Sequence, residues 1–208
     1  MTVKIAITNQ KGGVGKTTTA VNLAATLAKT KRKVLLIDID PQANATSAVG
    51  IEPGTFQESI YEILLEQSDI NKCILSTEWP GLFIAPATRD LSGAEIELVS
   101  AFNRERFLKN VIEKVIDQYD YVFIDCPPSI GLLTVNALTA ADEVLVPIQC
   151  EYLALEGLGQ LLSNVEKVKT HLNERLHISM IALVMFDGRT KLSTQVVQEV
   201  RGHFGDKV

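Results

Sequence analysis

The sequence has few cysteines, and none of them are close together. Cys73, Cys126 and Cys150 are widely spaced and form no C-x-x-C pair. This spacing gives no support for a structural zinc site or a disulfide framework. It favours a protein of the reducing cytoplasm.

Long hydrophobic runs are also missing. No apolar stretch approaches the ~18 to 20 residues that are needed to span a bilayer. The N-terminus runs directly into a short alternating strand pattern, without the charged region, long apolar region and small-residue cleavage site of a secretory signal. We therefore expect a soluble protein that does not interact with membranes.

The charge balance shows no large positive excess. The formal net charge is −5 and the isoelectric point is near 5.3, which argues against a wholly cationic nucleic-acid-binding surface and allows only a local basic patch. The most obvious cluster, Lys31-Arg32-Lys33, follows the first expected helix, where cations favour the negative end of the helix dipole. We therefore assign this cluster a structural role.

The pattern of apolar residues changes repeatedly between the periods of strands and helices. Strands are predicted at Val3 to Thr8, Val34 to Ile37, Tyr121 to Ile124, Val144 to Ile148 and Ile178 to Met185. Helical spacing occurs at Ala20, Leu23, Ala24 and Leu27, at Phe107, Leu108, Val111, Ile112 and Val115, and at Leu158, Leu161, Leu162, Val165 and Leu172. This alternation predicts a doubly wound α/β fold, with a mostly parallel sheet, helices on both faces and ligands at the carboxyl ends of the strands.

The chain shows no repeat, low-complexity tract or linker, and 208 residues with 46% hydrophobic content suffice for one domain over residues 1–208. The stretch Glu52 to Gly93 is less regular. We interpret it as an insertion, with a helical patch near Ser59 to Glu66 and a possible extra strand at Leu82 to Ala85.

The most informative stretch lies between the first strand and the first helix. It reads Lys11, Gly12, Gly13, Val14, Gly15, Lys16, Thr17, Thr18. Glycines let the backbone wrap a phosphate, a helix that begins near Gly15 directs free N–H groups at it, and Lys16 adds a point charge. Thr17 offers a hydroxyl to a magnesium ion. The general P-loop pattern expects glycine where this chain has Gln10, and Lys11 is a second lysine.

Two other interpretations of this loop fit less well. A tight strand-to-helix connection does not require Gly-Lys-Thr at the helix start. A dinucleotide fingerprint, with Asp38 as its acidic residue, would place its third glycine at Thr18 and direct Lys16 into the pyrophosphate site.

Acidic residues follow two other predicted strands. Asp38 and Asp40 precede a polar stretch that is suited to sensing a γ-phosphate, and Asp40 is a candidate for ordering magnesium or the attacking water. Asp125 ends an apolar strand in the manner of a Walker B acid, which a magnesium site beside a phosphate loop requires. The neighbouring Cys126 has no histidine placed to activate it, so we expect a small buried side chain there.

Together, KGGVGKTT, DIDPQANAT and DCPPS, in this order, resemble the deviant Walker A ATPases, and most closely the ParA/Soj partition group. The resemblance runs from Val3 to about Val208. It implies a P-loop NTPase fold that binds ATP and Mg²⁺ and hydrolyses ATP slowly. It makes Lys11 the signature lysine that reaches the partner's phosphates in a nucleotide-sandwich homodimer, Lys16 and Thr17 the phosphate and magnesium ligands, Asp40 the residue that positions water, and Asp125 the Walker B acid.

The resemblance also implies a partition function. In this group the ATP-bound dimer binds DNA without sequence preference, and a ParB-type activator stimulates hydrolysis. In the last segment, from Arg189 to Val208, cations outnumber acidic residues: Arg189, Lys191, Arg201 and Lys207 against Glu199 and Asp206. Arg189 also matches a basic position of the group. A nucleoid-associated protein of the cytoplasm is expected.

The sequence leaves alternatives open. Members of the group continue with another strand and a terminal helix, whereas this chain stops at Val208, where a strand is expected to begin. A MinD-like positioning ATPase, an iron–sulfur carrier of the nitrogenase-iron-protein kind, a ligase or kinase of the dethiobiotin-synthetase kind, and an inactive nucleotide-binding module remain candidates.

Overall fold

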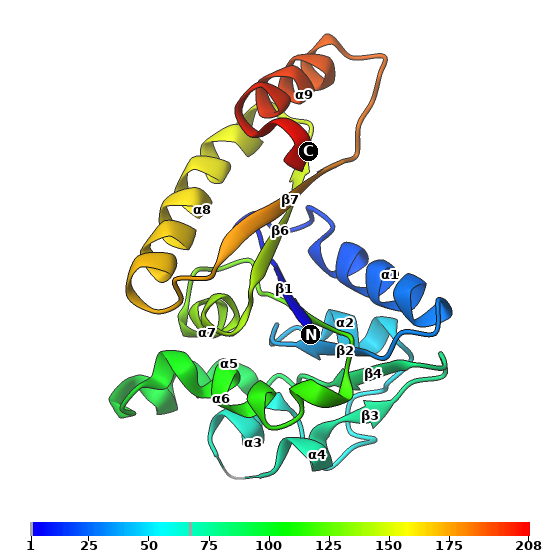
Figure 1. The fold of residues 1–208 in the computed structure, drawn as a ribbon, viewed down its shortest axis with the longest axis vertical. Coiled ribbons are helices and arrows are strands. Elements are labelled where there is room, and N and C mark those ends of the chain that lie inside the picture. The colour runs from blue at the N-terminus through cyan, green and yellow to red at the C-terminus, as the bar shows by residue number, and fades with distance from the viewer. Residues whose placement is uncertain (1, 67) are drawn as a thin grey trace.

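The computed structural model describes residues 2–66 and 68–208, with residues 152–156 described by their backbone only. Its centre is a seven-stranded sheet in the order β3-β4-β2-β5-β1-β6-β7 (Figure 1). All neighbouring strands are parallel except β3 and β4. The strands are β1 Val3–Ile7, β2 Val34–Asp38, β3 Leu75–Ser76, β4 Leu82–Ala85, β5 Tyr121–Asp125, β6 Glu143–Gln149 and β7 His177–Val184.

Successive residues of the central strands face opposite sides of the sheet, and both sides are buried. In β2, Leu36 belongs to one apolar cluster, whereas Leu35 and Ile37 belong to the other. In β5, Phe123 likewise lies opposite Val122 and Ile124. Burial on both faces explains why these strands appear in the sequence as continuous apolar runs.

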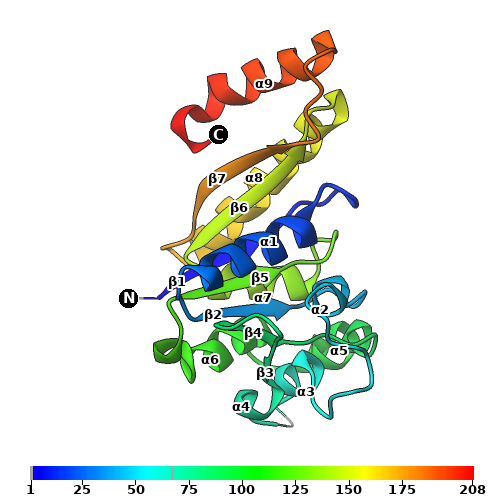
Figure 2. The same ribbon diagram turned by 90° about the vertical axis from the view of Figure 1, so that its right-hand side faces the viewer.

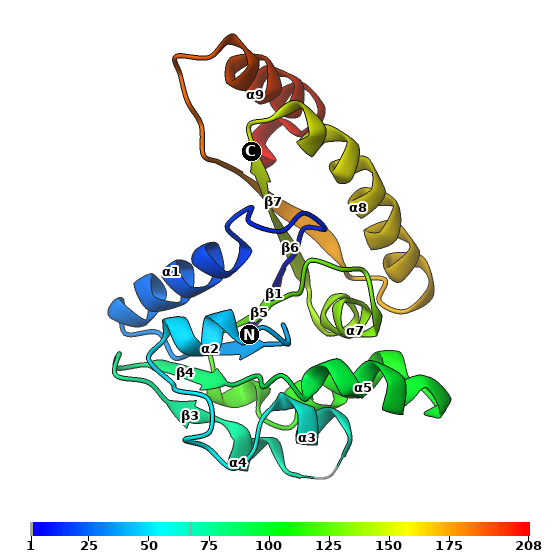
Figure 3. The same ribbon diagram turned by 180° about the vertical axis from the view of Figure 1, so that it is seen from behind.

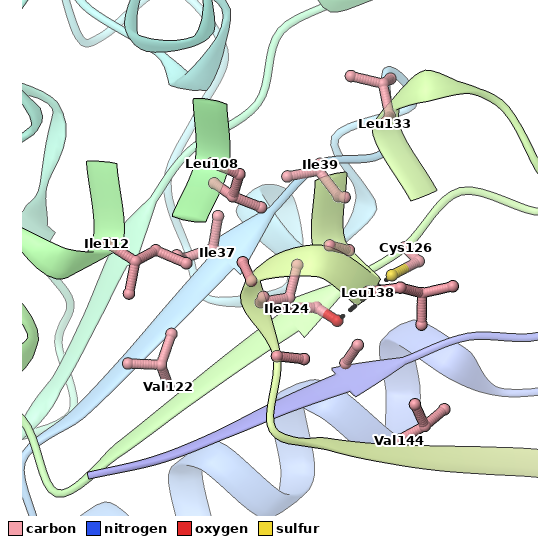
Figure 4. Close-up of a cluster of buried hydrophobic side chains, with 14 of the residues drawn as sticks. Ile37, Ile39, Leu108, Ile112, Val122, Ile124, Cys126, Leu133, Leu138 and Val144 are labelled. Atoms are coloured by element: carbon pink, nitrogen blue, oxygen red, sulfur yellow. Dashed lines mark hydrogen bonds between the residues drawn. The ribbon is translucent and has the colours of Figure 1, made fainter. Parts of the chain in front are cut away.

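Helices cover the two faces unequally. One face is packed by α1 Lys16–Lys29 and α2 Asn44–Ala48. The other face carries the larger cluster, part of which is shown in Figure 4, and a greater set of helices (Figure 3). These are α3 Ile60–Leu64, α4 Ile70–Cys73, α5 Leu91–Glu97, α6 Phe107–Glu113, α7 Leu132–Ala140, α8 Tyr152–His171 and α9 Lys191–Phe204. Short 3-10 turns occur at Leu98–Ser100, Arg104–Arg106, Ile116–Gln118 and Gly205–Lys207.

The predicted fold class is confirmed, and the predicted strands differ from the observed ones by at most one residue at either end. The possible strand at Leu82–Ala85 is present as β4. The helical patch near Ser59 is α3, which begins with a capping box between Ser59 and Glu62.

The interpretation of Glu52 to Gly93 as an insertion is wrong, because this segment supplies β3 and β4 to the sheet itself. The last residues of the chain form a turn, and the strand expected to begin at Val208 stays a prediction. Gly205 adopts a positive φ of 55°, and a 3-10 turn follows in which the N–H of Val208 donates to the carbonyl of Gly205. Helix α7 was not predicted because it is buried almost all round and therefore lacks the apolar stripe of an amphipathic helix.

Within the described residues, no helix has both the length and the apolar character that crossing a membrane would require.

Candidate functional site

The phosphate loop joins β1 to α1 at the carboxyl edge of the sheet, as expected. Gly13 and Gly15 have φ angles of +73° and +79°, which favour glycine. Gly15 is the N-cap of α1 and Lys16 is its first residue, so the helix begins where the sequence predicted. No side chain among the described residues caps this N-terminus, and its first N–H groups remain free to bind an anion.

Two residues that the sequence analysis missed support the loop from β1 and β6. Asn9 accepts the N–H of Lys11 over 3.0 Å through Oδ1, and its amide donates to the carbonyl of Pro147 over 2.7 Å. The amide of Gln149 donates to the carbonyl of Gly13 over 3.3 Å. Both are polar residues at the carboxyl end of buried strands, and this position was the signal that could have identified them.

Lys16 lies inside the loop. It is 7% exposed, and its Nζ donates to the carbonyl of Lys11 over 3.2 Å. Burial lowers the pKa of Lys16, while the nearby carboxylates of Asp125 and Asp40 oppose that shift. The geometry therefore holds a partly desolvated cation at the centre of the loop, where it can contact phosphate oxygens.

Thr17 and Asp125 meet at the start of α1. The Thr17 hydroxyl donates to Asp125 Oδ2 over 2.7 Å, across 108 positions of sequence. The contact arises because β5 lies beside β1, which places Asp125 opposite Ile7 in the parallel register. Asp125 is fully buried, and its other oxygen, Oδ1, has no hydrogen-bond partner among the described residues.

Asp125 and Asp38 lie side by side at the ends of neighbouring strands. Burial, reinforced by the charge of Asp38, raises the pKa of Asp125 to about 7. Burial also raises the pKa of Asp38 to about 6, although this carboxylate accepts hydrogen bonds from the N–H and hydroxyl of Thr46 and from the N–H of Asp40. With its oxygens occupied, Asp38 anchors the loop that carries Asp40 and Thr46.

Asp40 differs from Asp38 because its carboxylate accepts fewer hydrogen bonds from the described residues. Its Oδ1 accepts the N–H of Gln42 over 2.9 Å, and its charge acts on both Lys16 and Asp125. Asp40 is 6% exposed and lies at the sheet edge that carries the phosphate loop. It is thus a carboxylate close to the expected phosphate position that accepts from one backbone donor only among the described residues.

Lys11 and Arg189, the first and the last of the predicted site residues, lie further from this centre. Lys11 points its Nζ at Glu151 Oε2, 2.8 Å away, at the N-cap of α8. Arg189 lies in the loop between β7 and α9 and is paired with Asp187, its side chain being 90% exposed. The structure therefore brings residues 11–18, Asp40 and Asp125 to the carboxyl edge of the sheet, whereas Arg189 follows the end of β7 and its only side-chain partner among the described residues is Asp187.

The donor set fits magnesium better than a metal held by protein alone. Among the described residues, no three histidine, cysteine or acidic side chains are grouped to hold a metal ion. Mg²⁺ is commonly bound through one or two carboxylates together with phosphate oxygens and waters. The free Oδ1 of Asp125, beside the Thr17 hydroxyl, suits such a shared site.

Cys126 follows Asp125 and is buried beside the site. Its thiol is buried, which strongly raises its pKa, and Sγ lies 3.8 Å from the carbonyl of Ile124 (Figure 4). The expectation of a small buried side chain is confirmed.

Comparison with known proteins assigns the family. A family model described as an AAA domain matches residues 2–178. The sporulation initiation inhibitor protein Soj of Bacillus subtilis is 56% identical over 98% of this chain and 81% of its own length. The chromosome partitioning protein ParA of Myxococcus xanthus is 53% identical over 98% of this chain and 72% of its own.

The chain belongs to the ParA/Soj family of partition ATPases.

Solved structures agree with the fold of this family. A plasmid partition protein from Borrelia burgdorferi superimposes with a TM-score of 0.84 at 30% identity, covering 99% of this chain and 87% of its own. A cobyrinic acid a,c-diamide synthase from Mycobacterium smegmatis, with bound ADP and magnesium, gives a TM-score of 0.93 at 40% identity, covering 99% and 83%.

Proposed function

We propose that the chain binds magnesium-ATP at the carboxyl edge of its sheet and hydrolyses it as a partition switch. The observation that carries this proposal is the contact between Thr17 and Asp125, which leaves Asp125 Oδ1 free beside an uncapped helix N-terminus. Residues 12–18 would surround the phosphates, Lys16 would neutralise them, and Thr17 and Asp125 would hold the magnesium. The magnesium ion would neutralise charge that develops on the phosphates. The solved relative with ADP and magnesium supports this choice of ligand.

Asp40 is the residue that we assign to water. A phosphoryl-transfer site works by positioning and charge neutralisation, and a side chain that orients the attacking water is one of its recurring parts. Asp38 is unsuited to this task because Thr46 and Asp40 N–H occupy its oxygens. Among the described residues, Asp40 accepts a hydrogen bond only from the N–H of Gln42, on one oxygen, so the other oxygen would be available to a water or to the magnesium shell.

Lys11 supports dimerisation on ATP. It lies at the rim of the phosphate loop, and its side chain is 40% exposed, so its ammonium can leave Glu151 and reach outward. A cation supplied by a partner is worth on the order of 10³-fold or more in comparable phosphoryl-transfer sites. We infer that two chains face each other across two nucleotides and that each Lys11 contacts the partner's phosphates.

The dimer would bind DNA without sequence preference through the β7–α9 loop and α9. Arg189 is exposed there, and Lys191, Arg201 and Lys207 lie on the same segment. Two protomers would double this weak positive surface, and binding through phosphates would be strongly salt-dependent. A ParB-type activator would then stimulate hydrolysis and release the dimer, so that the protein would act on the nucleoid.

A second function is favoured by one observation, the 40% identity to the cobyrinic acid a,c-diamide synthase. An ATP-dependent ligase of this kind would use the same loop to activate a carboxylate of a small acid. The partition relatives are more similar, at 50 to 56% identity for the Soj and ParA proteins of four bacteria. We therefore place partition first.

The test is ATP turnover by the purified chain in four conditions: alone, with duplex DNA, with a ParB-type peptide, and with both. A partition switch should turn over slowly alone and fastest with both additions. A ligase should ignore both and respond to a small carboxylic acid with an ammonia donor. Loss of turnover in the Asp125→Ala variant would show that the activity belongs to this site and not to a contaminant.

A further inference from the structure

The opposite edge of the sheet carries a hollow that the nucleotide site does not use. A cavity of about 460 Å³ lies between the end of α1 and the loop that joins β3 to β4. Its apolar lining comes from Ala25, Ala28, Trp79 and Pro80. The rest of the lining consists of Gly81 and four cations, Lys29, Lys31, Arg32 and Lys33. We call these nine residues the α1-end pocket.

The two loops that form the α1-end pocket are held against each other by their backbones. The N–H of Val34 donates to the carbonyl of Gly81 over 2.8 Å, and a Cβ on Gly81 would lie 2.9 Å from the carbonyl oxygen of Arg32. Trp79 begins a turn in which its carbonyl accepts the N–H of Leu82 over 3.0 Å. The hollow is therefore a fixed part of the fold and needs no rearrangement to form.

Trp79 is the only tryptophan of the sequence, and it is 39% exposed. Ala25 and Ala28 are 9% and 4% exposed, so Trp79 supplies the exposed apolar surface of the pocket. None of the other exposed large apolar side chains among the described residues lines this cavity. A large aromatic side chain left half-covered beside a hollow is suited to receive an apolar side chain from another molecule.

The cations of the α1-end pocket exceed what the fold requires. Arg32 pairs with Asp120 over 3.6 Å, whereas Lys29, Lys31 and Lys33 make no ion pair within the described part of the chain. The dipole of α1 explains one or two positive charges at its end. It does not explain a hollow with an exposed tryptophan between them. Asp120 and Glu78 are the acidic residues of these loops, so positive charge predominates.

We propose that the α1-end pocket is a docking site for an acidic peptide segment of a partner protein, which seats one aromatic or large aliphatic side chain against Trp79. The lysines would contact carboxylates on either side of that anchor. One buried anchor with complementary charges at its rim is the usual arrangement of a peptide-binding hot spot.

Two other anionic partners fit the pocket less well. An anionic membrane surface is bound by apolar side chains that project outward, whereas the apolar atoms here line a hollow. Single-stranded nucleic acid stacks successive bases on several aromatic side chains, whereas this pocket offers one. A cavity of this volume and a single aromatic residue favour the peptide.

The α1-end pocket is separate from the nucleotide site. Helix α1 begins at the phosphate loop and ends at the pocket, and its 14 residues span about 20 Å. Figure 2 shows that α1 runs along the sheet between these two edges. Peptide binding should therefore occur with or without nucleotide, which allows this proposal to fail or succeed independently of the proposed ATPase.

The test uses Trp79 as its own reporter. The probe is a synthetic peptide with one central phenylalanine between glutamates, titrated at low salt without nucleotide while Trp79 fluorescence is recorded. We expect a saturable change that disappears when the phenylalanine is replaced by serine or the glutamates by glutamine. Vesicles of phosphatidylglycerol with phosphatidylcholine, and oligothymidylate, serve as the other two arms and should produce no saturable change.

A charge-reversed variant, Lys31→Glu with Lys33→Glu, should bind the peptide at least about tenfold more weakly. The matched control is Lys72→Glu with Lys167→Glu, which changes the net charge equally on α4 and α8 and should bind as the parent does. Because all four side chains are exposed, the variants should fold, and circular dichroism checks this. The proposal is overturned if the peptide gives no saturable change, if both double variants weaken binding equally, or if only vesicles or oligothymidylate change the fluorescence.

Discussion

The carboxyl edge of the sheet and the segment from Arg189 to Val208 hold charge in opposite ways. At the carboxyl edge, Lys16, Asp38 and Asp125 are almost completely buried, and the charges of Lys16 and Asp38 both act on Asp125. In the last segment, charged side chains such as Arg189 stand in solvent. Buried charges interact strongly and depend on every neighbour, whereas exposed charges are screened and become significant only in number. Substitutions at the carboxyl edge should therefore have large effects, and those in the last segment small ones.

The largest effect is expected from Lys16→Ala. The variant should lose nucleotide binding by about 100-fold or more in Kd, because the loop then offers no buried cation to the phosphates. Titration of a fluorescent ATP analogue measures this change. Lys72→Ala, which removes an exposed lysine on α4, is the control and should bind as the parent does. Equal affinities of the two variants would remove Lys16 from the site.

Asp40→Ala should separate binding from hydrolysis. Because Asp40 is assigned to the attacking water and not to the phosphates, we expect nucleotide affinity close to that of the parent and hydrolysis slower by about 100-fold. The dimer should then persist in ATP, which light scattering after size-exclusion chromatography detects. Hydrolysis at the parental rate would require another residue for the water.

The position of Asp40 was predictable because its signal is local. Phosphate loops and acidic strand ends are short motifs, and ligands lie at the carboxyl ends of parallel strands, so the sequence alone brings these motifs together. The same rule applies to Asn9 and Gln149, but their contacts depend on β6 lying next to β1. Strand order is a property of the whole chain, and no short pattern encodes it.

Other features could not be predicted from the sequence, for different physical reasons. Helix α7 is buried almost all round, so its sequence shows no periodic contrast between apolar and polar residues. Strand β3 has only two residues, which is too short for alternation to be recognised, so the sequence indicated β4 but not the pairing that places both strands in the sheet. The ion pair between Lys11 and Glu151 joins residues 140 positions apart and likewise has no local signal.

The third prediction concerns pH. The fold raises the pKa of Asp38 to about 6 and of Asp125 to about 7, from an ordinary value of 3.8. Between these values the folded chain holds more protons than the unfolded chain, so the contribution of these groups to the free energy of unfolding falls as pH rises. Their contribution is fully present below about pH 4 and is lost by about pH 7.

Asp125→Asn tests this in the nucleotide-free protein. The variant should be more stable than the parent near pH 8, by about 1 to 2 kcal/mol, because a buried charge is removed, and its stability should depend less on pH. Urea unfolding at several pH values measures both quantities. Asp187→Asn is the control, since the pKa of the partly exposed Asp187 is lowered by its hydrogen bonds from Arg189 and its removal should not flatten the profile. A parent whose stability rises between about pH 5 and pH 7, with no flattening in the variant, would contradict the assignment.

The smallest effect is expected in the last segment, from Arg189→Ala. In an ATP-locked dimer this variant should weaken duplex DNA retention only a few-fold at low salt and reduce the salt dependence by about one phosphate contact per protomer. The reason for the small size is Asp187, whose carboxylate lies 2.7 Å from the Arg189 guanidinium and already neutralises part of its charge. Asp187→Ala should therefore act in the opposite direction and strengthen retention, by releasing Arg189 to the DNA. Retention that is unaffected by either substitution would place the DNA surface elsewhere. A loss as large as that from Lys16→Ala would show that Arg189 is desolvated in the complex. The charges of the exposed segment would then interact as strongly as those of the buried carboxyl edge.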